Sequence, residues 1–104
     1  MIVEQRDYHV ITGKLNELVQ LYETEGIELQ QSYLGNLLGA FTTDIGALST
    51  YTSMWGYASY AEREERRARL QADERWQDFL ARLQPLLHTQ QNRILIPTSF
   101  SPIR

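Results

Sequence analysis

The chain has 104 residues, a net charge of −3, 42% hydrophobic residues and no cysteine, a composition typical of one soluble globular domain spanning residues 1–104. The acidic balance argues against nucleic acid as a partner, and the absence of cysteine excludes disulfides, thiol nucleophiles and thiolate metal ligands. No apolar run is long enough to span a membrane and the first residues do not resemble a signal peptide, so we expect a cytoplasmic protein.

The sequence of residues 2–10 predicts a strand with charged residues on both faces. Alternation divides its side chains into two sets: Val3, Gln5, Asp7 and His9 on one face, and Ile2, Glu4, Arg6, Tyr8 and Val10 on the other. Neither face is cleanly apolar. Such a strand more often borders a cavity or an interface than a dry core.

A helix over residues 14–31 follows from apolar side chains at helical spacing, and Gly26 is a point where it could bend or end. Residues 34–45 predict a second strand, in which two glycines, Gly35 and Gly39, allow a bulge. The third strand is expected over residues 48–58. Because only a short turn separates these two strands, we expect an antiparallel hairpin.

Ser59 and Glu62 fit a capping box, which predicts a helix beginning at that serine. Asp73 offers a second N-cap, and the apolar side chains that follow mark an amphipathic helix stopped by Pro85: Trp76, Phe79, Leu80 and Leu83. A fourth strand is expected from about residue 86 to 96. The tail, residues 98–104, is expected to be extended and to dock on a neighbouring chain.

This order of elements predicts an α+β, ferredoxin-like protomer, with a four-stranded antiparallel sheet covered by helices on one face. The opposite face of the sheet needs a cover that so small a chain does not supply. We therefore expect a homodimer through the sheet faces.

Two groups of side chains are candidates for a ligand site. Trp55 and Tyr57 share a strand face with Ser53 and Tyr51, which suits either the wall of a pocket or ordinary core and interface packing. Arg63 and Arg67 lie four residues apart on one helix face, so that one anion could meet both. The same run also places Glu62 with Arg66, and Glu64 or Glu65 with Arg69, at the spacing of surface ion pairs.

The remaining chemistry-bearing residues give weaker signals. His9 and His88 are the only histidines, and neither has a partner at a metal-ligand spacing, so no metal site is expected. The two could converge in space, and His9 with Asp7 could supply a general base. Phosphate-binding glycine loops and nucleophile elbows are absent.

Several segments, in this order, resemble the NIPSNAP family of the dimeric α/β-barrel superfamily. They are Leu38 to Gly46, the Trp55-Gly-Tyr57 stretch with its following arginines, Trp76, Gln91 to Leu95, and Phe100-Ser-Pro102. The resemblance implies a ferredoxin-like protomer whose sheet packs on a second copy in a two-chain barrel. Many family members carry a histidine two residues before the tryptophan, where this chain has Ser53. The superfamily also includes cofactor-free monooxygenases, haem-degrading enzymes and isomerases with an aromatic-lined cavity.

The sequence thus predicts a homodimeric module that binds a small apolar or anionic molecule or another protein, without a cofactor. The predicted ligand-binding residues are Tyr8, Ser53, Trp55, Tyr57, Arg63 and Arg67. One alternative is a cofactor-independent monooxygenase or isomerase acting on a small aromatic or polyketide-like substrate, with His9 or Asp7 as the general base. A purely structural assembly partner is the other.

Overall fold

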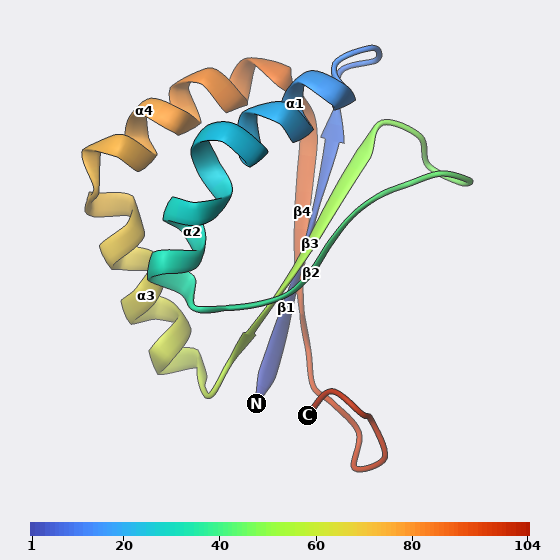
Figure 1. The fold of residues 1–104 in the computed structure, drawn as a ribbon. Coiled ribbons are helices and arrows are strands. Elements are labelled where there is room, and N and C mark those ends of the chain that lie inside the picture. Colours follow the sequence, from blue (N-terminus) through green and yellow to red (C-terminus); the bar gives the residue numbers. More distant parts are fainter.

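The fold was analysed in a computed structural model that describes residues 1–104. Four antiparallel strands form one sheet in the order β2-β3-β1-β4. The helices arch over one face of that sheet and leave the other bare (Figure 1). The predicted α+β, ferredoxin-like fold is therefore confirmed.

The strands are β1 (Ile2–Val10), β2 (Asn36–Thr42), β3 (Thr50–Tyr57) and β4 (Leu87–Leu95). The helices are α1 (Leu15–Leu21), α2 (Ile27–Leu34), α3 (Tyr60–Ala72) and α4 (Glu74–Leu83). A π-helical segment, η1 (Tyr22–Gly26), joins α1 to α2, and a 3-10 turn, η2 (Gln84–Leu86), leads from α4 into β4. No helix in the structure is both long and apolar enough to cross a lipid bilayer.

The core lies between the helices and the covered face of β1 and β3. Aromatic rings dominate it: Tyr22 stacks on Tyr51 with ring centroids 4.9 Å apart, and it meets Phe79 edge-on at 5.0 Å. Trp76 stacks on Phe79 at 4.9 Å. The predicted apolar face of α4 is thus buried as expected, apart from Leu80, which is half-buried.

The predicted first helix is interrupted at Gly26, as expected, but it continues beyond residue 31 to Leu34. A side chain at Gly26 would place its Cβ 2.4 Å from Cζ of Phe79, so the glycine lets the π-helical segment approach α4. Leu34, expected in a strand, is the last residue of α2, and its side chain is fully buried in the core. Gly35, with φ of +86°, then ends the helix.

The predicted hairpin is confirmed, with strands shorter than expected at both ends. β2 and β3 pair antiparallel, and the register shifts between Leu37 and Gly39, where a bulge was predicted. Residues 43–49 form the connection, in which Gly46 has a φ of +124°. The loop is therefore longer than the short turn that the sequence suggested.

Both predicted helix caps are present, one of them in altered form. The hydroxyl of Ser59 accepts a hydrogen bond from the Glu62 N–H at 3.1 Å, but the Glu62 carboxylate accepts from Ala58 N–H rather than from Ser59. Asp73 caps α4 by accepting from the Arg75 N–H at 2.8 Å. These caps fix where α3 and α4 begin, and so which of their side chains face the sheet.

The bare face of the sheet carries Val3, Gln5, Asp7 and His9, as the alternation predicted. The tail lies beside one end of this face, where Pro97 and Ile103 line a groove together with Val3 and Met54. The tail is not fully extended, because Ser101 N–H donates to the Thr98 carbonyl at 3.1 Å and closes a turn beyond β4 (Figure 1). Its predicted docking on a neighbouring chain stays a prediction.

Candidate functional site

A buried carboxylate on the covered face of β1 organises a cluster of charged side chains. Glu4 is completely buried, and its oxygens accept hydrogen bonds from Arg6 Nη1 at 3.0 Å and Asn92 Nδ2 at 3.1 Å. Arg63, on α3, donates to the same carboxylate from Nη2 at 2.8 Å and from Nε at 3.2 Å. β1, β4 and α3 are thus joined through one carboxylate.

The cluster holds more positive than negative charge. Burial alone would raise the pKa of Glu4, but the Arg63 hydrogen bond and the charges of Arg6, Arg63 and Arg67 keep that pKa below its usual value. Against this single carboxylate stand the three guanidinium groups. The interior between the sheet and α3 is therefore cationic.

Arg67 differs from the other two arginines in having no partner. Arg6 and Arg63 are both bonded to Glu4, and Arg6 Nε also donates to the Tyr8 hydroxyl at 3.1 Å. Arg67 forms neither a hydrogen bond nor an ion pair, and burial, together with the neighbouring Arg6 charge, lowers the pKa of its guanidinium. An unpaired, half-buried cation favours the approach of an anion.

Arg67 lines a partly enclosed cavity of about 180 Å³ between the sheet and the helices. The polar part of the wall comes from Arg6, Tyr8, Gln30 and Arg67. Its apolar part comes from α4 and the strand after it: Trp76, Leu80, Leu83 and Leu87. Three exposed glutamines lie at the rim: Gln71, Gln84 and Gln90. The cavity can hold a small molecule that has one anionic end and an apolar body.

Of the predicted ligand-binding residues, Tyr8 and Arg67 lie in this cavity, and Arg63 is connected to it through Glu4. Trp55, Ser53 and Tyr57 do not line it. They are buried in the core, where Trp55 Nε1 donates to the Ser53 hydroxyl at 3.2 Å. Arg63 and Arg67 do share a face, but the carboxylate that meets Arg63 belongs to the chain itself.

The predicted ion pairs form along α3, with one change of partner. Glu62 bonds Arg66 at 2.9 Å, and Glu65 lies 4.0 Å from Arg69. Glu64 contacts Arg63 instead of Arg69. The acidic residues of this run thus stay at the surface, while Arg63 and Arg67 turn towards the sheet.

The residues proposed as a general base lie on the other side of the sheet. Asp7 and His9 alternate with Tyr8 and so face away from the cavity. Asp7 accepts from the Thr52 hydroxyl at 2.7 Å, and His9 Nδ1 lies 3.2 Å from the Thr50 hydroxyl. His88 is exposed on β4. In this chain, therefore, no cavity combines Trp55 with His9 or Asp7.

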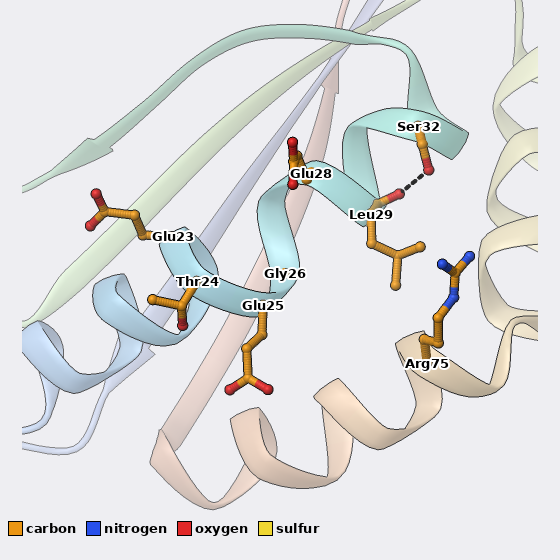
Figure 2. A pocket seen from close by; sticks show the side chains of 8 residues that line it. All are labelled: Glu23, Thr24, Glu25, Gly26, Glu28, Leu29, Ser32 and Arg75. Carbon is orange, nitrogen blue, oxygen red and sulfur yellow. Dashed lines mark hydrogen bonds between the residues drawn. The ribbon is translucent and has the colours of Figure 1, made fainter.

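A larger hollow of about 600 Å³ lies at η1 and the start of α4, but its charged side chains do not converge on one point (Figure 2). Figure 2 shows the carboxylates of Glu23, Glu25 and Glu28 pointing in different directions, with Arg75 on the opposite side. No group of three or more His, Cys, Asp or Glu side chains is arranged to hold a metal ion. This hollow is a polar surface depression.

Sequence reasoning missed four residues of the site: Glu4, Arg6, Gln30 and Asn92. The signal for the first two was present, because both are charged residues on the same face of β1 as apolar neighbours. Gln30 and Asn92 carried no such signal, since isolated amides in a helix and a strand are ordinary surface residues.

The topology and the helices on a single sheet face define an α+β protein of the ferredoxin-like class. Its fold resembles that of an antibiotic biosynthesis monooxygenase, with a TM-score of 0.65, 10% identity, and coverage of 94% of this chain and 99% of that chain. So distant a likeness shows the fold alone.

Within that class the chain belongs to the NIPSNAP family, whose sequence profile matches residues 3–102. A crystal structure of a NIPSNAP family protein from Agrobacterium tumefaciens is 52% identical, covers 99% of this chain and 98% of that chain, and has a TM-score of 0.97. An uncharacterised NIPSNAP-like domain protein from Burkholderia xenovorans is 45% identical over 97% of this chain and 88% of that chain, with a TM-score of 0.95.

Curated relatives include protein NipSnap homolog 1 of Danio rerio, 29% identical over 103 residues. That match takes in 99% of this chain and 36% of the relative, so the chain spans about a third of the length of the curated relatives it matches.

Proposed function

We propose that this NIPSNAP domain binds a small carboxylic acid in the cavity between its sheet and its helices. The observation that carries the proposal is the unpaired guanidinium of Arg67, which lines the cavity together with Arg6. A carboxylate there would supply the missing negative charge and accept charge-assisted hydrogen bonds. Such a ligand leaves the bonds between Glu4 and the other arginines intact.

The size and lining of the cavity narrow the ligand further. At about 180 Å³ it is smaller than the range of roughly 300–1,000 Å³ that is usual for drug-sized ligands, so the acid has few non-hydrogen atoms. Trp76 and the three leucines offer an apolar surface opposite the arginines. An aromatic or short aliphatic body attached to the carboxylate would bury its surface there.

The same arrangement supports binding rather than the monooxygenase or isomerase activity considered from the sequence. The only carboxylate near the cavity, Glu4, already accepts four hydrogen bonds and has a lowered pKa, so it is a poor general base. Asp7 and His9 face away from the cavity.

We further propose that the domain acts as a homodimer through the bare sheet face. The Phe41 ring, 56% exposed, lies over Gly39 on this face, next to the strand that carries Met54. These apolar groups, and the lack of any helix over them, support association with a second copy.

The ligand proposal is tested by calorimetry and thermal denaturation with benzoate and with its uncharged analogue benzamide. We expect benzoate, but not benzamide, to bind and to raise the melting temperature. The Arg67→Met variant keeps the apolar stem of the side chain and loses the charge, and should weaken benzoate binding about tenfold to a hundredfold.

Arg69→Met is the matched control, because Arg69 lies on the same helix with its side chain 56% exposed. It should leave benzoate binding unchanged. Arg67→Met should also keep nearly the stability of the wild type, because it removes a half-buried charge that has no hydrogen-bonded partner. Equal binding of benzoate by the wild type and Arg67→Met would overturn the proposal.

A further inference from the structure

Gln30 is a second unpartnered polar group of the cavity. It lies on α2, is only 2% exposed, and lines the same cavity as Arg67. Its Oε1 is fully buried without a hydrogen-bond partner. Buried side-chain amides are nearly always bonded, so this one calls for a partner from outside the chain.

We propose that the acid bound in this cavity is a hydroxycarboxylic acid, whose hydroxyl is recognised by the Gln30 amide while its carboxylate meets Arg67 and Arg6. This inference rests on the proposed binding of a carboxylic acid. It adds a second recognition element, on α2, to the arginines of α3 and β1.

The chemistry of the amide selects a hydroxyl. A carboxylate oxygen only accepts hydrogen bonds, so it satisfies the two guanidinium groups but not the buried Oε1, which needs a donor. The amide presents an acceptor oxygen and a donor nitrogen side by side, and its buried oxygen lacks a partner. A hydroxyl is both a donor and an acceptor, so a single hydroxyl placed beside Gln30 can satisfy the amide.

The other buried groups without partners do not compete for this role. The hydroxyls of Tyr22 and Tyr57 are also buried and unbonded, but neither residue lines the cavity. Tyr8 does line it, and its hydroxyl already accepts a hydrogen bond from Arg6. Gln30 therefore carries the one fully buried side-chain oxygen of the cavity that has no hydrogen-bond partner.

The test compares benzoate with its three monohydroxylated isomers by calorimetry, on the wild type and on Gln30→Met, a variant of similar shape without the amide. Butyrate and its hydroxylated analogue serve as a matched aliphatic pair. In the wild type we expect one hydroxylated acid to bind at least about tenfold more tightly than its plain counterpart.

In Gln30→Met that preference should disappear, while affinity for the plain acid stays within about threefold of the wild type. Thermal denaturation of Gln30→Met without ligand checks that the variant is folded. If plain acids bind but no hydroxylated acid is preferred, or if the preference survives in Gln30→Met, the role of Gln30 is overturned and the binding of carboxylic acids stands. If the wild type binds neither kind of acid, both proposals fail.

Discussion

Glu4 is the only buried carboxylate among three buried or half-buried arginines. Removing one partner of a buried ion pair leaves an uncompensated charge, which typically costs about 3–5 kcal/mol. Glu4→Gln keeps the shape of the side chain and removes the charge. We expect this variant to lower the free energy of unfolding by about 3 kcal/mol, measured by urea denaturation.

Glu64→Gln is the control for this prediction. Glu64 also pairs with Arg63, but its side chain is 71% exposed, and exposed ion pairs contribute about 0–1 kcal/mol. The glutamine at position 64 should therefore leave the free energy of unfolding nearly unchanged. If the two substitutions lowered the free energy of unfolding equally, burial of Glu4 would not explain how much its ion pairs stabilise the protein.

Tyr51 makes stability sensitive to alkali. Burial, and then the neighbouring Tyr8, raise the pKa of Tyr51 to about 12, above its usual value of 10.0. Because the folded pKa is the higher one, the stabilising contribution is complete below pH 10 and is lost as the pH rises from 10 through about 12. The loss at high pH is on the order of 2 kcal/mol.

Urea denaturation between neutral pH and pH 12, with tyrosinate absorbance followed in parallel, measures this loss. Tyr51→Phe should flatten part of the alkaline decline, whereas Tyr60→Phe should not, because the Tyr60 ring is 56% exposed. An alkaline decline of the same size in wild type and Tyr51→Phe would contradict the assignment to this residue.

The π-helical segment η1 depends on the absence of a side chain at Gly26. In an ordinary helix, Ala in place of Gly gains about 1 kcal/mol. At position 26 the new methyl group would lie 2.4 Å from Phe79, whose ring is held between Trp76 and Tyr22. Overpacking of a core costs about 1–3 kcal/mol, so we expect Gly26→Ala to destabilise the protein by about 1–2 kcal/mol in urea.

The Phe79→Leu variant tests whether the Phe79 ring is the reason that Gly26→Ala destabilises the protein. If the clash with the ring is responsible, Gly26→Ala should cost less in the Phe79→Leu background, and the double-mutant cycle should show coupling of about 1 kcal/mol. Purely additive effects would mean that the glycine is needed for another reason.

The elements that follow from local patterns could be predicted from the sequence. β1 has the predicted bounds and faces, and Ser59 and Asp73 begin α3 and α4 as their capping chemistry indicated. What local patterns do not contain is the contact between distant segments. Gly26 was recognised as a break, but its reason is the ring of Phe79, which the sequence does not place beside it.

The candidate site was predictable only in part, for the same reason. Arg63 and Arg67 were selected for their shared helix face, but the buried partner of Arg63 is Glu4, 59 residues away in the chain. The sequence instead paired Glu62 with Arg66, and Glu64 or Glu65 with Arg69. The aromatic stretch at Trp55 suited either a pocket wall or core packing, and its rings are buried in the core at the centre of β3.

At the scale of the whole molecule, the helices cover one side of the sheet and the other side is bare (Figure 1). A stable dimer buries about 800 Å² of each partner, a modest share of the 6490 Å² that this chain exposes. The bare face combines apolar groups, such as Met54 and Phe41, with polar groups that already bond one another, such as Asp7 and Thr52. A polar centre bonded within its own chain can be covered without leaving unpaired groups.

We therefore expect light scattering coupled to size-exclusion chromatography to give twice the chain mass of 12.1 kDa at micromolar concentration.

Met54 lies on the central part of the bare face, paired with Gln5 on one side and Gly39 on the other. In a symmetric dimer, Met54→Glu would bury one negative charge from each chain in the same interface. It should therefore shift the protein to monomer. Gln31→Glu adds the same charge on an exposed position of α2 and should leave the dimer intact. A wild type that elutes as a monomer, or a Met54→Glu variant that stays dimeric, would show that the bare sheet face is not the interface.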